Sequence, residues 1–201
     1  MAAELFYIYD THCPWSYVTT PLVNAIAKAF PTIKLHLWHS ARYDGEEGIT
    51  RSQIEAATSD SNTRFSQDYI DISSQPKDST ITANLMAWTQ NKASHLSLKL
   101  LNALQEAHFN SGNELDSEEK LADIISQLKL SPPQKVFAIE KLTKEAEIAL
   151  HDIEEFQTMM GTSAIPALLL AVEDNLVLLN HNLYLKKPQA IVEAVKSEMG
   201  E

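Results

Sequence analysis

Residues 5–38 place one helix between two strands, and this order limits the possible folds more than any other feature of the chain. The run LFYIY at residues 5–9 is apolar and aromatic and ends at Asp10, which predicts a strand buried on both faces. Apolar residues recur at helical spacing over residues 14–30, and Pro14 suits the first helical position. Residues 33–38 alternate apolar and polar side chains, which indicates a second strand. Because two strands joined in this way lie parallel in one sheet, we expect an α/β fold.

The rest of the chain is helical first and then returns to strands. Residues 41–75 are polar and predict loops and short helices. Apolar runs at residues 167–172 and 176–179 flank a short turn, which predicts a hairpin. Four helices are expected around it: residues 81–109 with a break near Asn91, a helix after a capping box of Asp116 and Glu119, one from Ser131-Pro132-Pro133-Gln134 to Gly161, and one opened by Pro188.

The resulting order is β-α-β, a large helical insertion, and then β-β-α, which is the order of a thioredoxin fold. We therefore expect a thioredoxin-like domain made of residues 1–40 and 160–201, interrupted by a mainly helical insertion of residues 41–159. Ligand sites favour the interface between such parts, so the cleft between them is the expected functional site.

Charge and cysteine content narrow the function. The chain has 16 basic and 27 acidic residues, a formal charge of −11, and no basic block. Such a surface repels phosphate and anionic lipid, which argues against nucleic-acid and membrane partners. No signal peptide or long apolar span is recognisable. One cysteine cannot form an internal disulfide. A cytoplasmic location is therefore expected.

The cysteine lies at the junction of the first strand and first helix, in the motif Cys13-Pro14-Trp15-Ser16. A thiolate there meets the positive end of the helix dipole and backbone N–H groups, and we expect both to lower the Cys13 pKa. His12 would add positive charge when protonated, and Ser16 would donate a hydrogen bond to the sulfur. Pro14 and Trp15 are expected to shape the loop, with the Trp15 ring offering a surface for ligand stacking.

Ile165-Pro166 comes just before the hairpin and is the second expected part of the site. A proline at that point suits a cis peptide bond, which would present the Ile165 backbone across from the thiol. An extended peptide or glutathione would then pair with that backbone as an added strand. No spacing of His, Cys, Asp and Glu predicts a metal site.

Three segments resemble the DsbA-like branch of thioredoxin-fold proteins: FYIYDTHCPWSYV, LQEAHFNSGNELDSEEKLADI and GTSAIPALLL. This branch includes FrnE-type oxidoreductases, kappa glutathione transferases and hydroxychromene-carboxylate isomerases. The resemblance implies a thiol-disulfide oxidoreductase with Cys13 as nucleophile. Such enzymes often carry a second, resolving cysteine where this chain has Ser16, so only monothiol chemistry is open, with an external thiol completing the turnover.

The resemblance also implies glutathione as co-substrate, with no tightly bound cofactor. Kappa-type relatives place polar groups after the last strand to bind glutathione, and His181 and Asn182 occupy that region here. Two alternatives stay open. One is a glutathione-dependent transferase or isomerase of the kappa type, and the other is a catalytically inactive peptide-binding module. The oligomeric state is left open, with a dimer possible because some relatives form one.

Overall fold

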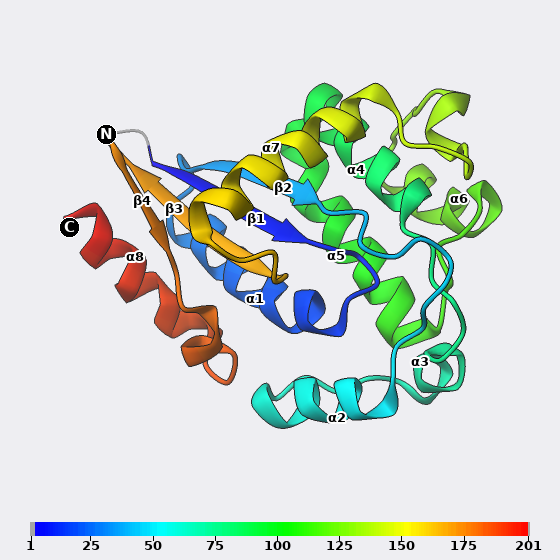
Figure 1. Cartoon of the computed structure of the whole chain (residues 1–201), viewed down its shortest axis with the longest axis horizontal. Helices are drawn as coiled ribbons and strands as arrows, with labels where there is room; N and C mark the ends of the chain where they lie inside the picture. Colours follow the sequence, from blue (N-terminus) through cyan, green and yellow to red (C-terminus); the bar gives the residue numbers. More distant parts are fainter. Residues whose placement is uncertain (1–2, 201) are drawn as a thin grey trace.

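A four-stranded sheet of order β2-β1-β3-β4 runs through the molecule (Figure 1). The computed structural model describes residues 3–200. β2 is parallel to β1, whereas β3 is antiparallel to β1 and β4 is antiparallel to β3. The strands are β1 (Glu4–Tyr9), β2 (Lys34–His39), β3 (Ala167–Val172) and β4 (Asn175–Leu178). The predicted parallel pair and the predicted hairpin are both confirmed.

Helices surround the sheet and fill the long connection between β2 and β3. The α-helices within residues 3–200 are α1 (Pro14–Ala29), α2 (Arg51–Asp60), α3 (Gln67–Ile72), α4 (Thr80–Lys92), α5 (Ser94–Ser111), α6 (Glu118–Gln127), α7 (Lys144–Met160) and α8 (Ile191–Met199). Three short 3₁₀ helices accompany them: η1 (Gln134–Phe137), η2 (His181–Tyr184) and η3 (Pro188–Ala190). None of these helices is both long and apolar enough to cross a membrane.

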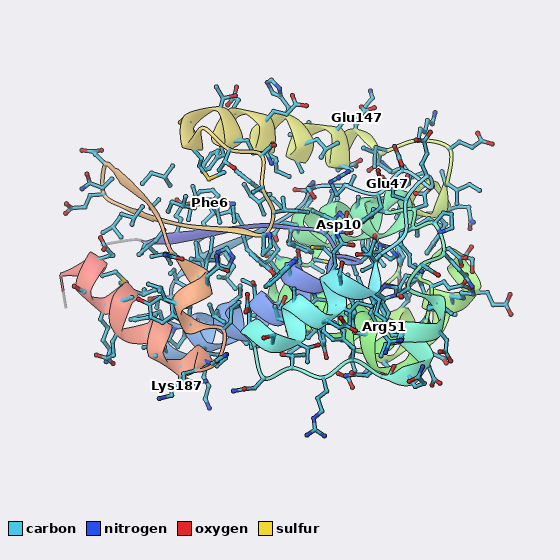
Figure 2. All side chains as sticks on the ribbon, turned by 60° about the horizontal axis from the view of Figure 1, so that its bottom comes forward. Phe6, Asp10, Glu47, Arg51, Glu147 and Lys187 are labelled. Atoms are coloured by element: carbon cyan, nitrogen blue, oxygen red, sulfur yellow. The ribbon has the colours of Figure 1, made fainter. Side chains whose placement is uncertain are left out.

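Both faces of the sheet are covered, as the apolar β1 sequence requires. Leu5, Tyr7 and Tyr9 point from β1 into the main core, which they share with α1 and α8. Phe6 and Ile8 point the other way, into a smaller cluster under α7. Figure 2 shows Phe6 in the space between the sheet and α7.

The inserted helices share the main core and also form a smaller cluster of Ile49, Ile54, Tyr69 and Phe109. Buried side chains of α4 and α5 belong to the same hydrophobic cluster as those of β1 and α1. The division into residues 1–40 and 160–201 on one side and 41–159 on the other stays a prediction, and its outer ends, residues 1–2 and 201, lie outside the described residues. The expected break near Asn91 is confirmed, since α4 ends at Lys92 and α5 begins at Ser94.

The predicted helix from Ser131 to Gly161 is wrong in its first part. Residues 134–137 form only η1, and α7 begins at Lys144 with the Thr143 hydroxyl as its cap. The buried Asn84 side chain of α4 accepts the Thr143 N–H at 2.7 Å and donates to the carbonyl oxygens of Ala138 and Lys141, at 3.4 and 3.3 Å. These bonds hold residues 138–143 out of the helix. Gly161 ends α7 in the left-handed conformation, as predicted.

The predicted capping box of Asp116 and Glu119 is also wrong. The cap of α6 is Ser117, whose hydroxyl accepts the Lys120 N–H. The Asp116 carboxylate instead pairs with the ammonium group of Lys120 at 3.3 Å. Asp and Ser are similarly favourable as N-caps, so the path of the chain decides which of the two residues takes that position.

Candidate active site

Cys13 occupies the junction that the sequence predicts, as the residue immediately before α1. Its N–H donates to the Asp10 carbonyl oxygen at 3.2 Å, and its own carbonyl oxygen accepts the Tyr17 N–H at 3.0 Å. The first bond closes a tight loop after β1, and the second is the first hydrogen bond of the helix. Cys13 is 6% exposed, so the thiol sits at the base of the loop, almost out of contact with solvent.

Burial raises the pKa of the Cys13 thiol, contrary to the expectation from the helix dipole. The Ser16 N–H, the Ser16 hydroxyl and the Trp15 N–H all favour the thiolate, whereas the Asp10 carboxylate opposes it. Removal from water outweighs these favourable contributions, and the Cys13 side chain makes no capping hydrogen bond to α1. In the free protein the thiol form predominates at neutral pH.

Ser16 is fixed so that its hydroxyl proton is available to the sulfur. It is fully buried, and its Oγ accepts the Asp10 N–H at 3.2 Å. Its carbonyl oxygen accepts the Tyr7 and Thr20 hydroxyls at 2.6 and 3.0 Å. Since the Ser16 oxygen already accepts from the backbone, its own proton is free to be donated to Cys13.

Asp10 organises the loop, a role for which the sequence gives no signal beyond its position three residues before Cys13. Its carboxylate accepts the N–H groups of His12 and Arg42 at 2.9 and 2.7 Å, and the Ser79 hydroxyl at 2.9 Å. Figure 2 shows Asp10 well inside the molecule. Burial opposes its ionised form, yet the neighbouring His39 and the hydrogen bonds from His12 hold the Asp10 pKa below its ordinary value.

The His12 ring turns toward the helical insertion. It is fully buried, with Nε2 3.2 Å from the Glu114 carbonyl oxygen and Nδ1 3.3 Å from the Ser79 hydroxyl. Because a carbonyl oxygen only accepts, Nε2 carries a proton in this arrangement. Nδ1 lies 3.6 Å from the Asp10 carboxylate. A positive charge on His12 would therefore be paired with Asp10 before it could act on Cys13.

His39 is the last residue of β2 and is neutral beside Asp10 at neutral pH. Its Nε2 accepts the Thr11 N–H at 3.1 Å, and its Nδ1 faces the Ala41 N–H at 3.1 Å. Backbone N–H groups that face both ring nitrogens disfavour a second proton on the ring. Burial, opposed by Asp10 and assisted by His12, lowers the pKa of His39 to about 4.

Aromatic side chains from the insertion surround the thiol, and the sequence gives no signal for them. The His12 ring lies 4.8 Å from the His108 ring and 6.3 Å from the Tyr43 ring, measured between centroids. His108 in turn lies 5.1 Å from Tyr69. Burial first, and then the proximity of Cys13, raises the pKa of both Tyr43 and Tyr69. The loop that carries the sulfur is therefore covered by buried aromatic and polar side chains.

Ile165-Pro166 is a cis peptide bond, as predicted. The strand register pairs Ala167 with Ile8, which sets Pro166 level with Tyr9 at the end of β1 that leads into the Cys13 loop. Ile165 packs against the cluster containing Phe6 and Ile8. The Cys13 loop and Ile165-Pro166, the two parts of the site predicted from opposite ends of the chain, thus lie at the same end of the sheet.

The other nominated residues lie farther out. Pro14 is the buried first residue of α1, and Trp15 is half-buried against the main core. His181 and Asn182 lie in η2, directly after β4. The Leu179 N–H bonds the Leu168 carbonyl oxygen, so η2 starts at the same end of the sheet as Pro166. It lies two strands across from β1, on the β4 side.

The donor set does not resemble a metal centre. Within residues 3–200, no three side chains of His, Cys, Asp or Glu converge closely enough to hold an ion. Asp10, His12 and His39 are held instead by backbone N–H groups, hydroxyls and a carbonyl oxygen.

Comparison with known proteins gives structural neighbours only. No protein-family model matches the chain, and no curated protein matches it in sequence. Among solved structures, the cytosolic disulfide reductase DsbM from Pseudomonas aeruginosa with GSH matches 98% of this chain and 100% of its own, with 18% identity and a TM-score of 0.82. A second DsbM structure matches 98% of each chain, with 18% identity and a TM-score of 0.84.

A protein of Nitrosomonas europaea, provisionally named as a protein disulfide isomerase, matches 100% of this chain and 97% of its own. Its identity is 13% and its TM-score is 0.72. These neighbours share one fold over almost the full length of the chain. The predicted thioredoxin fold with a helical insertion is therefore confirmed.

Proposed function

We propose that this chain is a thiol-disulfide oxidoreductase that uses Cys13 as its only thiol and glutathione as the external thiol. The observation that carries the proposal is the placement of the Cys13 sulfur. It lies at the start of α1 among the Ser16 hydroxyl and the Trp15 and Ser16 N–H groups. The cis Ile165-Pro166 bond lies at the same end of the sheet. The fold shared with DsbM, whose structure contains GSH, supports the choice of partner.

The environment of Cys13 favours reduction of disulfides over their formation. Strongly oxidising members of this fold class stabilise their reduced thiolate and so have a low cysteine pKa. Burial does the opposite here, because it disfavours the Cys13 thiolate and raises its pKa. A thiol of high pKa is a poor leaving group and forms a more stable disulfide. The site is therefore suited to taking a disulfide from another molecule.

The absence of a second cysteine fixes the sequence of steps. The Cys13 thiolate attacks the glutathione sulfur of a mixed disulfide, and the substrate thiolate leaves and takes up the proton released by Cys13. A free glutathione then loses its proton and attacks the same glutathione sulfur, which forms oxidised glutathione and returns Cys13. The net reaction converts a mixed disulfide and one glutathione into a free thiol and oxidised glutathione. This chemistry suits a reducing compartment such as the cytoplasm.

Two secondary roles belong to this proposal. The Ile165 backbone, beside Pro166, would pair with the extended glutathione or peptide chain. His181 and Asn182 would meet the far end of that ligand, because η2 lies at the same end of the sheet. Trp15 would cover the ligand where its ring is exposed, and Pro14 would hold the loop.

The test is the reduction of a peptide–glutathione mixed disulfide by glutathione, with wild type and Cys13→Ser compared. We expect turnover only in wild type, and a Cys13 adduct heavier by one glutathione in mass spectrometry before free glutathione is added. Full turnover by Cys13→Ser would overturn the redox role and favour a kappa-type transferase. Peptide binding without turnover, equal in both proteins, would favour an inactive binding module.

A further inference from the structure

A groove with a volume of about 670 Å³ lies along β2, which is an edge strand of the sheet. Figure 1 shows α4 and α5 on this side of the sheet. The walls of this β2 groove include Leu35 and Leu37 of β2 and Ser94, His95, Ser97 and Lys99 of α5. The groove also contains Lys34, which pairs with Glu4 at the start of β1, whereas the Cys13 loop follows the other end of β1. The groove and the thiol are therefore separate sites.

The β2 groove is lined by basic side chains and by no carboxylate, although the chain as a whole is acidic. The chain has 27 acidic and 16 basic residues, yet the charged side chains of the groove are Lys34, His95 and Lys99. Lys34 pairs with the Glu4 carboxylate at 3.2 Å. Within residues 3–200, neither Lys99 nor His95 forms an ion pair with a carboxylate. The groove therefore attracts an anion locally.

The first turn of α5 adds further positive potential to the groove. α5 has 18 residues, and the residue before it is Ala93, whose side chain makes no capping hydrogen bond. Ser94 and His95 are its first two residues, and both are exposed. The first N–H groups of a helix have no partner within the helix and carry the positive end of its dipole. An anion in the β2 groove would therefore meet donors that the fold itself does not use.

Ser97 gives an independent indication of a ligand in the groove. This residue lines the groove and is only 2% exposed. Its hydroxyl has no hydrogen-bond partner within residues 3–200. A serine hydroxyl inside a helix can bond to the carbonyl oxygen four residues earlier, but the Ser97 hydroxyl does not. A buried polar group without a partner is destabilising, so this hydroxyl is a donor that a ligand in the groove would satisfy.

The remaining walls of the groove suit a small molecule better than a peptide. Leu35 and Leu37 make one wall apolar. The Gln90 side-chain amide accepts the Leu37 N–H and donates to the Leu35 carbonyl oxygen, both at 3.3 Å. Because this amide covers the edge of β2 as a further strand would, it blocks the addition of an extended peptide. The volume lies within the range of about 300–1,000 Å³ that is usual for small-molecule sites.

We propose that the β2 groove binds a small organic molecule that carries a phosphate group. The phosphate would lie at the first turn of α5 and accept from its N–H groups, the Ser97 hydroxyl and the Lys99 ammonium group. A phosphate ester has three acceptor oxygens where a carboxylate has two, which matches these three kinds of donor. The apolar part of the molecule would pack on Leu35 and Leu37. This second site does not depend on the proposed redox function.

Isothermal titration calorimetry with naphthyl phosphate, naphthol and inorganic phosphate tests the two parts of the site. We expect naphthyl phosphate to bind about tenfold more tightly than either of the others, because it alone reaches both the donors and the apolar wall. Naphthol binding as tightly as naphthyl phosphate would overturn the anion site. Inorganic phosphate binding as tightly would overturn the apolar wall as part of the site, and absence of binding by all three would overturn both.

Three variants test the named donors with naphthyl phosphate. Ser97→Ala and Lys99→Gln should each weaken binding about tenfold, because each loses a hydrogen bond to a charged group. Lys129→Gln is the control, since Lys129 is exposed and lies outside the groove, and it should bind like wild type. Ser97→Ala should not lower the Tm, because the hydroxyl that it removes has no partner in the protein. Unchanged binding by both Ser97→Ala and Lys99→Gln would overturn the inference.

Alkylation of Cys13 by iodoacetamide locates the ligand. We expect saturating naphthyl phosphate to leave the alkylation rate unchanged, because the β2 groove lies at the other end of the sheet. Protection of Cys13 by naphthyl phosphate would place the ligand at the thiol and overturn the inference. The redox assay of wild type and Cys13→Ser is independent of this result, so a failure of the β2 groove and a failure of the proposed function can be told apart.

Discussion

The Asp10 carboxylate accepts a hydrogen bond from the Ser79 hydroxyl, with 2.9 Å between Oδ1 and Oγ. The two residues are far apart in sequence and belong to the end of β1 and the start of α4. The same carboxylate also accepts the N–H groups of His12 and Arg42. One buried charge therefore joins the Cys13 loop, the segment after β2 and the helical insertion. Any change in Asp10 acts on both the stability of the fold and the reactivity of the thiol.

Asp10→Asn should destabilise the protein and make Cys13 more acidic. The amide offers one acceptor oxygen and turns donors toward groups that themselves donate, which should cost about 3 kcal/mol of unfolding free energy. The Asp10 charge raises the Cys13 pKa, so its removal lowers that pKa. Urea unfolding measures the first effect. The pH dependence of iodoacetamide alkylation measures the second without interference, since Cys13 is the only cysteine.

Asp44→Asn is the matched control. This substitution also removes one negative charge, but from an exposed position in the segment after β2. It should leave both measurements close to wild type. In wild type the alkylation midpoint should lie above the free-cysteine value of about 8.5. A wild-type midpoint well below that value would contradict the account of Cys13 as a thiol dominated by burial.

Ser16→Cys should convert the site to a dithiol. Both side chains are buried where α1 begins, with Cys13 just before the helix and Ser16 in its first turn. Residues that close meet the geometry of a disulfide. After incubation with oxidised glutathione, we expect the variant to lose both free thiols without retaining glutathione. Wild type should instead retain one glutathione. A stable glutathione adduct on the variant would show that the two positions do not meet.

Stability should begin to fall on acidification near pH 6.5, before most carboxylates titrate. Burial lowers the pKa of His39 to about 4 from an unfolded value of 6.5. Below pH 6.5, His39 binds a proton in the unfolded chain but not in the folded protein. The folded state therefore loses stability as the pH falls toward 4. A shift of this size corresponds to roughly 3 kcal/mol at most. Urea unfolding at pH 7, 6, 5 and 4 measures the slope.

His39→Gln should flatten that slope, and His151→Gln should not. His151 lies on the exposed face of α7, with its side chain 71% exposed. Buried His108 has a pKa shifted in the same direction, so part of the slope should persist in His39→Gln. Unfolding free energies of wild type that do not change between pH 7 and pH 5 would contradict the prediction.

Asn84→Ala should destabilise the fold by about 2–3 kcal/mol, because it leaves the Thr143 N–H unpaired in a buried position. Asn91→Ala is the control, since Asn91 is exposed on the same helix. Urea unfolding compares the two, and proteolysis at residues 138–143 reports on the local segment. If the two variants are equally stable, Asn84 does not hold that segment.

The helix from Ser131 shows why part of the fold could not be predicted. Its cap, its prolines and the apolar residues Val136, Ile139 and Leu142 all fit a helix in the sequence. Local preference sets only the likelihood of a helix, and three hydrogen bonds to Asn84 of α4 override it. Such bonds join residues more than fifty positions apart, and no local pattern records them.

The candidate site divides in the same way. Cys13, Ser16 and Ile165-Pro166 could be identified because their chemistry depends on position within a local element: the start of a helix and the start of a strand. The raised pKa of Cys13 could not be predicted from the sequence, because it depends on how much protein covers the sulfur. Asp10, Ser79, Tyr69 and His108 also carried no local signal.

The sequence by itself determined the order β-α-β and β-β-α, the position of the thiol at the start of α1 and the cis bond before β3. These follow from periodicity, prolines and apolar runs, whose effects act within a few residues. Tertiary structure alone decided what surrounds the sulfur. Burial, the charge on Asp10 and the contact of Tyr69 with His108 arise where β1, α3, α4 and α5 come together. The loss of solvent around the sulfur depends on all of its neighbours in space, so the direction of the Cys13 pKa shift is decided only in the folded chain.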